Sequence, residues 1–193
     1  MIEKGQTLVN LVTGERMTFL ETAAETGGAR VVIELHADPG GSVAAAHLHP
    51  GQWETFEVVS GTLGAKVAGR KVELGSGETL GIAPGVSHTW WNAGDGELVF
   101  RCAISPALQF ESLIETMFSL AADGKTNRKG MPNPFRLAVI AKAHFDTVRL
   151  PVVPAWMQKT ALGMGAPFGR AVGYGPTYTP ERTALERLVP RSA

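Results

Sequence analysis

Hydrophobic and β-branched residues in the first half of the chain occur in short runs that glycine-rich segments separate. Such runs are typical of strands, and the glycines between them indicate tight turns. The runs cover residues 7–12, 17–21, 30–36, 55–59, 61–67, 70–74, 79–82, 88–92 and 98–104. Many short strands at regular spacing predict a mainly β fold, a jelly-roll β-barrel, over residues 1–105.

The pattern changes at Ser105, which precedes Pro106. This pair is a typical helix start, because a serine hydroxyl caps a helix and proline fits its first position. Apolar residues then recur at helical spacing, and Gly124 is a suitable C-terminal stop. Two further helices and a last turn are predicted at residues 135–148, 156–164 and 180–188, with no regular structure directly after Gly165. Residues 106–193 are thus predicted as a helical extension, packed on the barrel or at a dimer interface.

Composition and charge exclude several classes of partner. Apolar residues make up 44% and charged residues 19% of the 193 residues, as in a globular protein with a full core. The 18 basic and 18 acidic side chains cancel, so no net charge draws the chain to nucleic acid or to an anionic membrane. We expect no membrane span and, because the first residues lack the apolar run of a secretory signal, a cytoplasmic location.

Four side chains outline a mononuclear metal site: His47, His49, Glu54 and His88. Residues i and i+2 of a strand point to the same face, so the first two imidazoles are predicted to project together. Three nitrogens and one carboxylate suit divalent iron, manganese, nickel, copper or zinc. Glu57 is an alternative carboxylate only if a bulge shifts the register, because a regular strand places it on the opposite face from Glu54.

Cys102 is the only cysteine, so an internal disulfide and a zinc–thiolate cluster are both excluded. It lies in an apolar stretch, and we expect a small buried core residue rather than a nucleophile. Phe100 shares its strand face, and the two are predicted to fill the barrel beneath the metal.

Other polar and aromatic residues near the predicted ligands are assigned smaller roles. His36 ends a strand and is expected at the surface or rim, while His144 is expected to pack or hydrogen-bond within a helix. Trp90 has the strand parity of His88, so it is predicted to face inward, either to line the pocket or to fill the core, with Trp91 facing outward.

The spacing of these residues resembles the two motifs of the cupin superfamily. The first, G-x5-H-x-H-x3,4-E-x6-G, is complete at Gly41, His47, His49, Glu54 and Gly61. The second, G-x5-P-x-G-x2-H-x3-N, fits at Gly77, Gly85, His88 and Asn92, with Ala83 in place of the expected proline. The resemblance implies one divalent metal ion held by His47, His49, Glu54 and His88 inside a small barrel, a small-molecule ligand beside it, and a homodimer.

Three functions are compatible with such a site. The first is a metal-dependent enzyme of the oxygenase type that acts on a small chelating substrate, with Glu54 as a base if it leaves the metal. The second is an isomerase of a sugar or keto acid, for which His36 and Glu57 are the nearby candidate bases. The third is a non-enzymatic binding or sensor module, because fold does not determine function.

Overall fold

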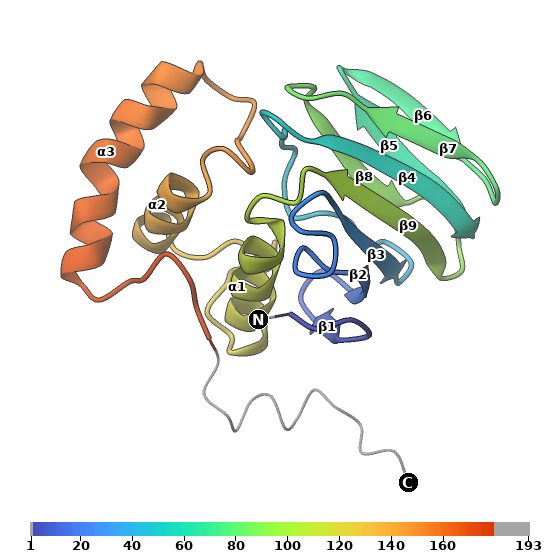
Figure 1. Ribbon diagram of the computed structural model, residues 1–193, viewed down its shortest axis with the longest axis horizontal. Coiled ribbons are helices and arrows are strands. Elements are labelled where there is room, and N and C mark those ends of the chain that lie inside the picture. The colour runs from blue at the N-terminus through green and yellow to red at the C-terminus, as the bar shows by residue number, and fades with distance from the viewer. Residues whose placement is uncertain (1, 180–193) are drawn as a thin grey trace, which may run out of the picture.

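Two antiparallel β-sheets and three helices make up the computed structural model, which describes residues 2–179 (Figure 1). Six strands form one sheet in the order β1-β2-β3-β9-β4-β7, and three form the other in the order β6-β5-β8. The strands are β1 (Thr7–Asn10), β2 (Glu15–Glu21), β3 (Val31–Ala37), β4 (Trp53–Ser60), β5 (Leu63–Val67), β6 (Arg70–Leu74), β7 (Thr79–Ile82), β8 (His88–Asn92) and β9 (Leu98–Ser105). The mainly β, jelly-roll prediction is confirmed.

Alternation along the strands builds the core of the barrel. In β3 and β9 every second residue is buried, and the two strands pair from Val31 opposite Ile104 to Ala37 opposite Leu98. The same period of two puts one face of β4 and of β8 inside the barrel. A polar residue at an inward position of these strands therefore lies inside the barrel core.

Gly61 and Asn92 of the two motifs shape the turns of the barrel. Gly61 has a φ of 85°, and a Cβ there would lie 2.8 Å from the carbonyl oxygen of Glu97, so a larger residue does not fit. The amide of Asn92 donates to the carbonyls of Ala37 and Gly96, at 2.9 and 2.8 Å. Both residues act on the backbone of the fold rather than on a ligand.

The helices are α1 (Phe110–Ala122), α2 (Pro134–Ala143) and α3 (Ala155–Ala171), and all lie on one side of the strands (Figure 1). The predicted helix start at Ser105 is wrong. Ser105 is the last residue of β9, its hydroxyl donates to the Ala29 carbonyl at 2.9 Å, and its peptide bond to Pro106 is cis. The helix begins one turn later, at Phe110, while Gly124 follows its end as predicted.

The other helices differ from prediction in length. Helix α2 stops at Ala143 instead of residue 148, and His144 caps it by donating through Nδ1 to the Ile140 carbonyl at 3.2 Å. Helix α3 continues to Ala171, so the expectation of no regular structure after Gly165 is wrong. Its glycines allow close packing on α2, and packing overrides the low helix propensity of glycine and of Pro167. The predicted turn over residues 180–188 lies outside the described residues.

Helix α1 joins the helices to the barrel. Phe110 and Phe118 are part of the barrel core, whereas Leu113 and Leu120 form a second cluster with Ile140 of α2. Within residues 2–179 no helix has the length and apolarity that a membrane span requires.

Candidate metal centre

The four predicted ligand side chains come together inside the barrel. Glu54 is on the inward face of β4, and His88 is on the inward face of β8. His47 and His49 lie just before β4, where His47 pairs with His88 through two backbone hydrogen bonds of 2.9 and 2.8 Å. One potential ligand atom from each of the four lies within 4.8 Å of the others. The cluster is what a mononuclear metal site requires.

Backbone carbonyls orient all three imidazoles. With Nδ1 as the donor, His47 bonds to the Ala45 carbonyl at 3.0 Å and His88 to the Val86 carbonyl at 3.0 Å. His49 reaches further, to the carbonyl of Thr147 at 2.7 Å. A proton on Nδ1 leaves the lone pair on Nε2, and this is the arrangement in which metal-ligating histidines are usually found.

The Nε2 atoms of His88 and His49 face one carboxylate oxygen. Glu54 Oε2 lies 2.7 Å from His88 Nε2 and 3.7 Å from His49 Nε2. These three buried atoms nevertheless lack a hydrogen-bond partner with suitable geometry. Buried polar atoms without partners are costly, and a cation among them would satisfy all three. The donor set therefore fits a divalent metal ion.

The protonation states of His47 and Glu54 suit metal binding, whereas burial of His88 is outweighed by contact with Glu54, which raises the pKa of His88, so a metal ion would have to displace a proton there. Burial, together with the neighbouring His88, lowers the pKa of His47 to about 4. Burial alone raises the pKa of Glu54, but contact with His88 and the charges of His49 and His47 outweigh it and lower the pKa to about 2. At neutral pH the cluster thus offers a neutral His47 and an ionised Glu54, the forms that bind metals.

Cys102 holds the second oxygen of Glu54. Its thiol donates to Glu54 Oε1 at 3.2 Å, and burial and the adjacent carboxylate raise the pKa of the thiol well above its usual value. Cys102 is buried, as predicted, and it remains protonated. The contact itself was not predicted, because it depends on the pairing of β4 with β9, which sets Phe56 opposite Cys102.

The remaining candidates take the places that strand parity predicts. Glu57 is exposed on the outer face of β4, and His36 contacts Arg16 and Glu97 on the outside of the sheet. Trp90 lines the internal cavity. Trp91 covers Gly64 instead, where a Cβ would lie 2.3 Å from the indole ring.

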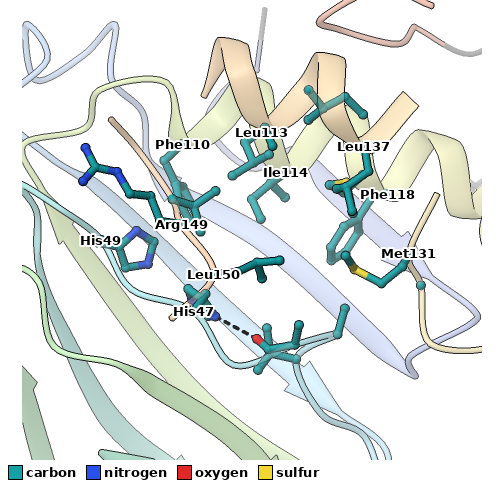
Figure 2. A pocket seen from close by; sticks show the side chains of 18 of the residues that line it. His47, His49, Phe110, Leu113, Ile114, Phe118, Met131, Leu137, Arg149 and Leu150 are labelled. Atoms are coloured by element: carbon teal, nitrogen blue, oxygen red, sulfur yellow. Dashed lines mark hydrogen bonds between the residues drawn. The ribbon is translucent and has the colours of Figure 1, made fainter. Parts of the chain in front are cut away.

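Sequence reasoning missed the contribution of the segment after α2. Besides the bond from His49 to Thr147, Leu48 and Arg149 exchange two backbone hydrogen bonds of 2.9 Å each. Figure 2 shows Arg149 beside His49, at one end of a cavity that the helices cover. Backbone contacts of this kind leave no residue pattern from which they could be found.

Comparison with known proteins agrees with this geometry. A family model described as "Cupin domain" matches residues 33–104, which contain all four clustered side chains. No curated protein matches the chain.

Several solved structures are similar over about half of the chain. A predicted oxalate decarboxylase from Thermotoga maritima has 24% identity and a TM-score of 0.47 over 55% of this chain and 99% of that one. An RmlC-like cupin from Shewanella frigidimarina has 18% identity and a TM-score of 0.48, over 56% and 89%. A sugar phosphate isomerase from Silicibacter pomeroyi has 20% identity and a TM-score of 0.44, over 50% and 62%. Residues 33–104 of this chain are therefore a cupin domain, folded within the barrel described above.

Proposed function

We propose that this protein binds one divalent metal ion through His47, His49, Glu54 and His88 and is an enzyme of the oxygenase type that acts on a small chelating molecule. The observation that carries the proposal is the convergence of three oriented imidazoles on an ionised, buried carboxylate. When bound, a divalent ion supplies Lewis-acid polarisation of a chelating oxygen and, if redox-active, access to dioxygen chemistry.

The protein side chains would position the substrate and move one proton. Glu54 presents Oε2 to the centre while Cys102 holds Oε1, so Oε2 is the atom that would accept a proton from the substrate once Glu54 leaves the metal. His49 is held by Thr147, which keeps its ring at a fixed angle during such a step. The helices that cover the cavity would exclude bulk water.

The same geometry disfavours the isomerase alternative. An isomerase requires a base beside the metal ligands, and both bases that the sequence offered, His36 and Glu57, face away from the cavity. Near the clustered side chains, the other ionisable residues on the described cavity wall are Cys102, which is protonated, and Arg149, which is a permanent cation, since Glu15 lies about six residues further along the sheet. Neither can take a proton from a substrate at neutral pH.

Elemental analysis tests the proposal first. Protein purified without chelators or an affinity metal column should contain near-stoichiometric iron, manganese, nickel or copper. His49→Ala should lose that metal, whereas His36→Ala, which removes a histidine outside the cluster, should retain it. Oxygen uptake by the loaded protein on a panel of chelating hydroxy-ketones and diketones then tests the reaction type.

The outcomes separate the three functions. Bound zinc without oxygen uptake would contradict the oxygenase proposal and favour isomerisation or binding. Tight binding of a chelating molecule without turnover would favour the sensor function. A folded protein that takes up no metal would contradict the metal site itself. Homodimer formation stays a prediction, which the molecular mass in solution would test.

A further inference from the structure

A cavity of about 430 Å³ lies between the barrel and the helical extension, directly beside the metal cluster. His47, His49 and Glu54 form part of its wall. Most of the remaining wall is apolar and comes from both the barrel and the helices, including Met17, Phe56, Trp90, Ile114, Met117 and Leu137. A cavity of this size is within the usual range for small-molecule sites.

The cavity is elongated, with the histidines at one end. Figure 2 shows His47 and His49 near Arg149 at that end, Met131 and Phe118 at the other, and apolar side chains between them. The register of the sheet likewise places Glu54 and Glu15 far apart along the strands. Glu54 is level with Val31 at the start of β3, and Glu15 is level with Ala37 at its end, six residues or about 20 Å along the strand.

The polar side chains along the helical part of the wall already have partners. Arg149 donates through Nε to the Phe145 carbonyl at 2.9 Å and lies on the Phe145 ring. The Gln158 amide donates to the carbonyls of Leu150 and Val153, at 2.8 and 2.7 Å. A polyhydroxylated ligand would leave its hydroxyl groups without partners here, and each such group is costly to bury.

The far end of the cavity has a polar group of its own. Asn10 and Glu15 line it, and both are buried. Asn10 lies near the Met131 end of the cavity. Gly130 directly precedes Met131, and a Cβ on Gly130 would be 3.9 Å from Asn10 Nδ2. The Thr13 hydroxyl donates to Glu15 Oε2, which leaves Oε1 for a ligand.

We infer that the cavity binds an elongated, mainly apolar molecule that has an oxygen-bearing chelating head at the histidines and a hydrogen-bond donor at the end that faces Glu15. The position of the head rests on the proposed function. The apolar body and the distal donor rest on the cavity wall alone. Fatty or terpenoid-like molecules with a terminal hydroxyl have this chemistry, whereas free sugars do not.

Hydroxamic acids of increasing chain length test the inference on the metal-loaded protein. The head group chelates the metal, and the alkyl chain reports the cavity. Since a buried methylene contributes about 0.8 kcal/mol, the four added methylenes should lower the Kd by about two-hundredfold from acetohydroxamic to hexanohydroxamic acid. A Kd that is independent of chain length would overturn the apolar body and leave the metal site intact.

A metal-independent probe keeps this result separate from the metal proposal. N-phenyl-1-naphthylamine, a neutral dye that fluoresces in apolar surroundings, should bind the metal-free protein. Ile114→Trp narrows the cavity and should weaken dye binding at least tenfold. Glu115→Trp, at the next position of α1 but outside the cavity wall, should not. Dye binding without metal uptake would contradict the proposed function and support the cavity, while no dye binding to any folded form would overturn the cavity as an apolar site.

A substitution at Glu15 tests the proposed hydrogen bond at the far end of the cavity. A terminal hydroxyl on the best-fitting chain should tighten binding by about fivefold to tenfold, as expected for one buried hydrogen bond. Glu15→Leu should abolish that gain and leave the Kd of the unhydroxylated chain within about twofold. An equal gain in both proteins would overturn the assignment of Glu15.

Discussion

The imidazole of His49 donates through Nδ1 to the backbone carbonyl of Thr147, at 2.7 Å and across 98 residues of sequence. One proposed metal ligand is therefore oriented by the segment that follows α2, while His47 and His88 are oriented by carbonyls within the barrel. Since Leu48 also pairs with Arg149, this segment is joined to the strand-like residues around His49 by three hydrogen bonds. The helical extension thus contributes directly to the geometry of the centre.

The bond from His49 to Thr147 depends on the backbone at Arg149, whose N–H donates to the Leu48 carbonyl at 2.9 Å. Arg149→Pro removes this donor, and we expect metal affinity to fall by about tenfold, as for loss of other groups that orient a ligand. Arg149→Ala keeps the N–H and should retain affinity within about threefold. Competition with a chromophoric chelator measures both. Equal affinity in the two variants would mean that the extension does not position His49.

Cys102 should tune the centre through Glu54. Cys102→Ala removes the donor to Oε1, and we expect metal binding about fivefold weaker, which corresponds to ~1 kcal/mol for one hydrogen bond. Cys102→Ser retains a donor and should recover most of the affinity. Iodoacetamide provides a second measurement: because burial and the carboxylate keep the thiol protonated, it should react only after unfolding. Rapid labelling of the folded protein would contradict the buried position.

Glu15 makes stability depend on pH. Burial raises its pKa from 4.5 to about 7, with the Thr13 hydroxyl opposing the shift. The folded state therefore binds the proton more tightly than the unfolded state, and this stability is present below pH 4.5 and lost as pH rises through about 7. The free energy of unfolding should fall by on the order of 3 kcal/mol over that range.

Urea unfolding at a series of pH values measures this effect. Glu15→Gln stays neutral and does not lose this stability. Between those limits the unfolding free energy of Glu15→Gln should therefore rise with pH relative to that of the unmodified protein. Glu57→Gln, a change of an exposed carboxylate on β4, is the matched control and should give a constant difference. A constant difference for Glu15→Gln as well would show that the carboxyl is hydrated in the folded state.

Local patterns were sufficient to predict the barrel and the clustered side chains. A period of two predicts which residues of β4 and β8 face inward, and so places Glu54 and His88 inside the same core. The carbonyl of Thr147 could not be predicted, because every residue has a carbonyl and only the fold selects one. The same limit applies to the bond between Cys102 and Glu54, which follows from strand pairing.

The helical half was harder to predict because its local signals are ambiguous. Serine before proline fits a helix start and equally the end of a strand, and Ser105 is the latter. Gly165 and Pro167 indicate a break by propensity, but α3 continues through both since its glycines pack against α2. Tertiary contact, rather than propensity, decides the extent of this helix.

That packing makes a last prediction about two glycines of α3. A Cβ at Gly169 would lie 2.5 Å from the Phe135 carbonyl oxygen and 2.6 Å from Val139 Cγ2, whereas a Cβ at Gly163 would meet nothing within 4 Å. Gly169→Ala should therefore destabilise the protein by about 2 kcal/mol through overpacking. Gly163→Ala should stabilise it by up to about 1 kcal/mol through helix propensity.

Urea unfolding of the two alanine variants measures both effects, and the opposite signs provide the control, because the chemical change is identical. Since α2 and α3 both contribute to the cavity wall, Gly169→Ala should also weaken binding of N-phenyl-1-naphthylamine, while Gly163→Ala should leave it unchanged. Equal stability of the two variants would mean that α3 does not rest on α2 through Gly169. The helices would then pack less tightly over the cavity than the close approach of Gly169 to the Phe135 carbonyl indicates.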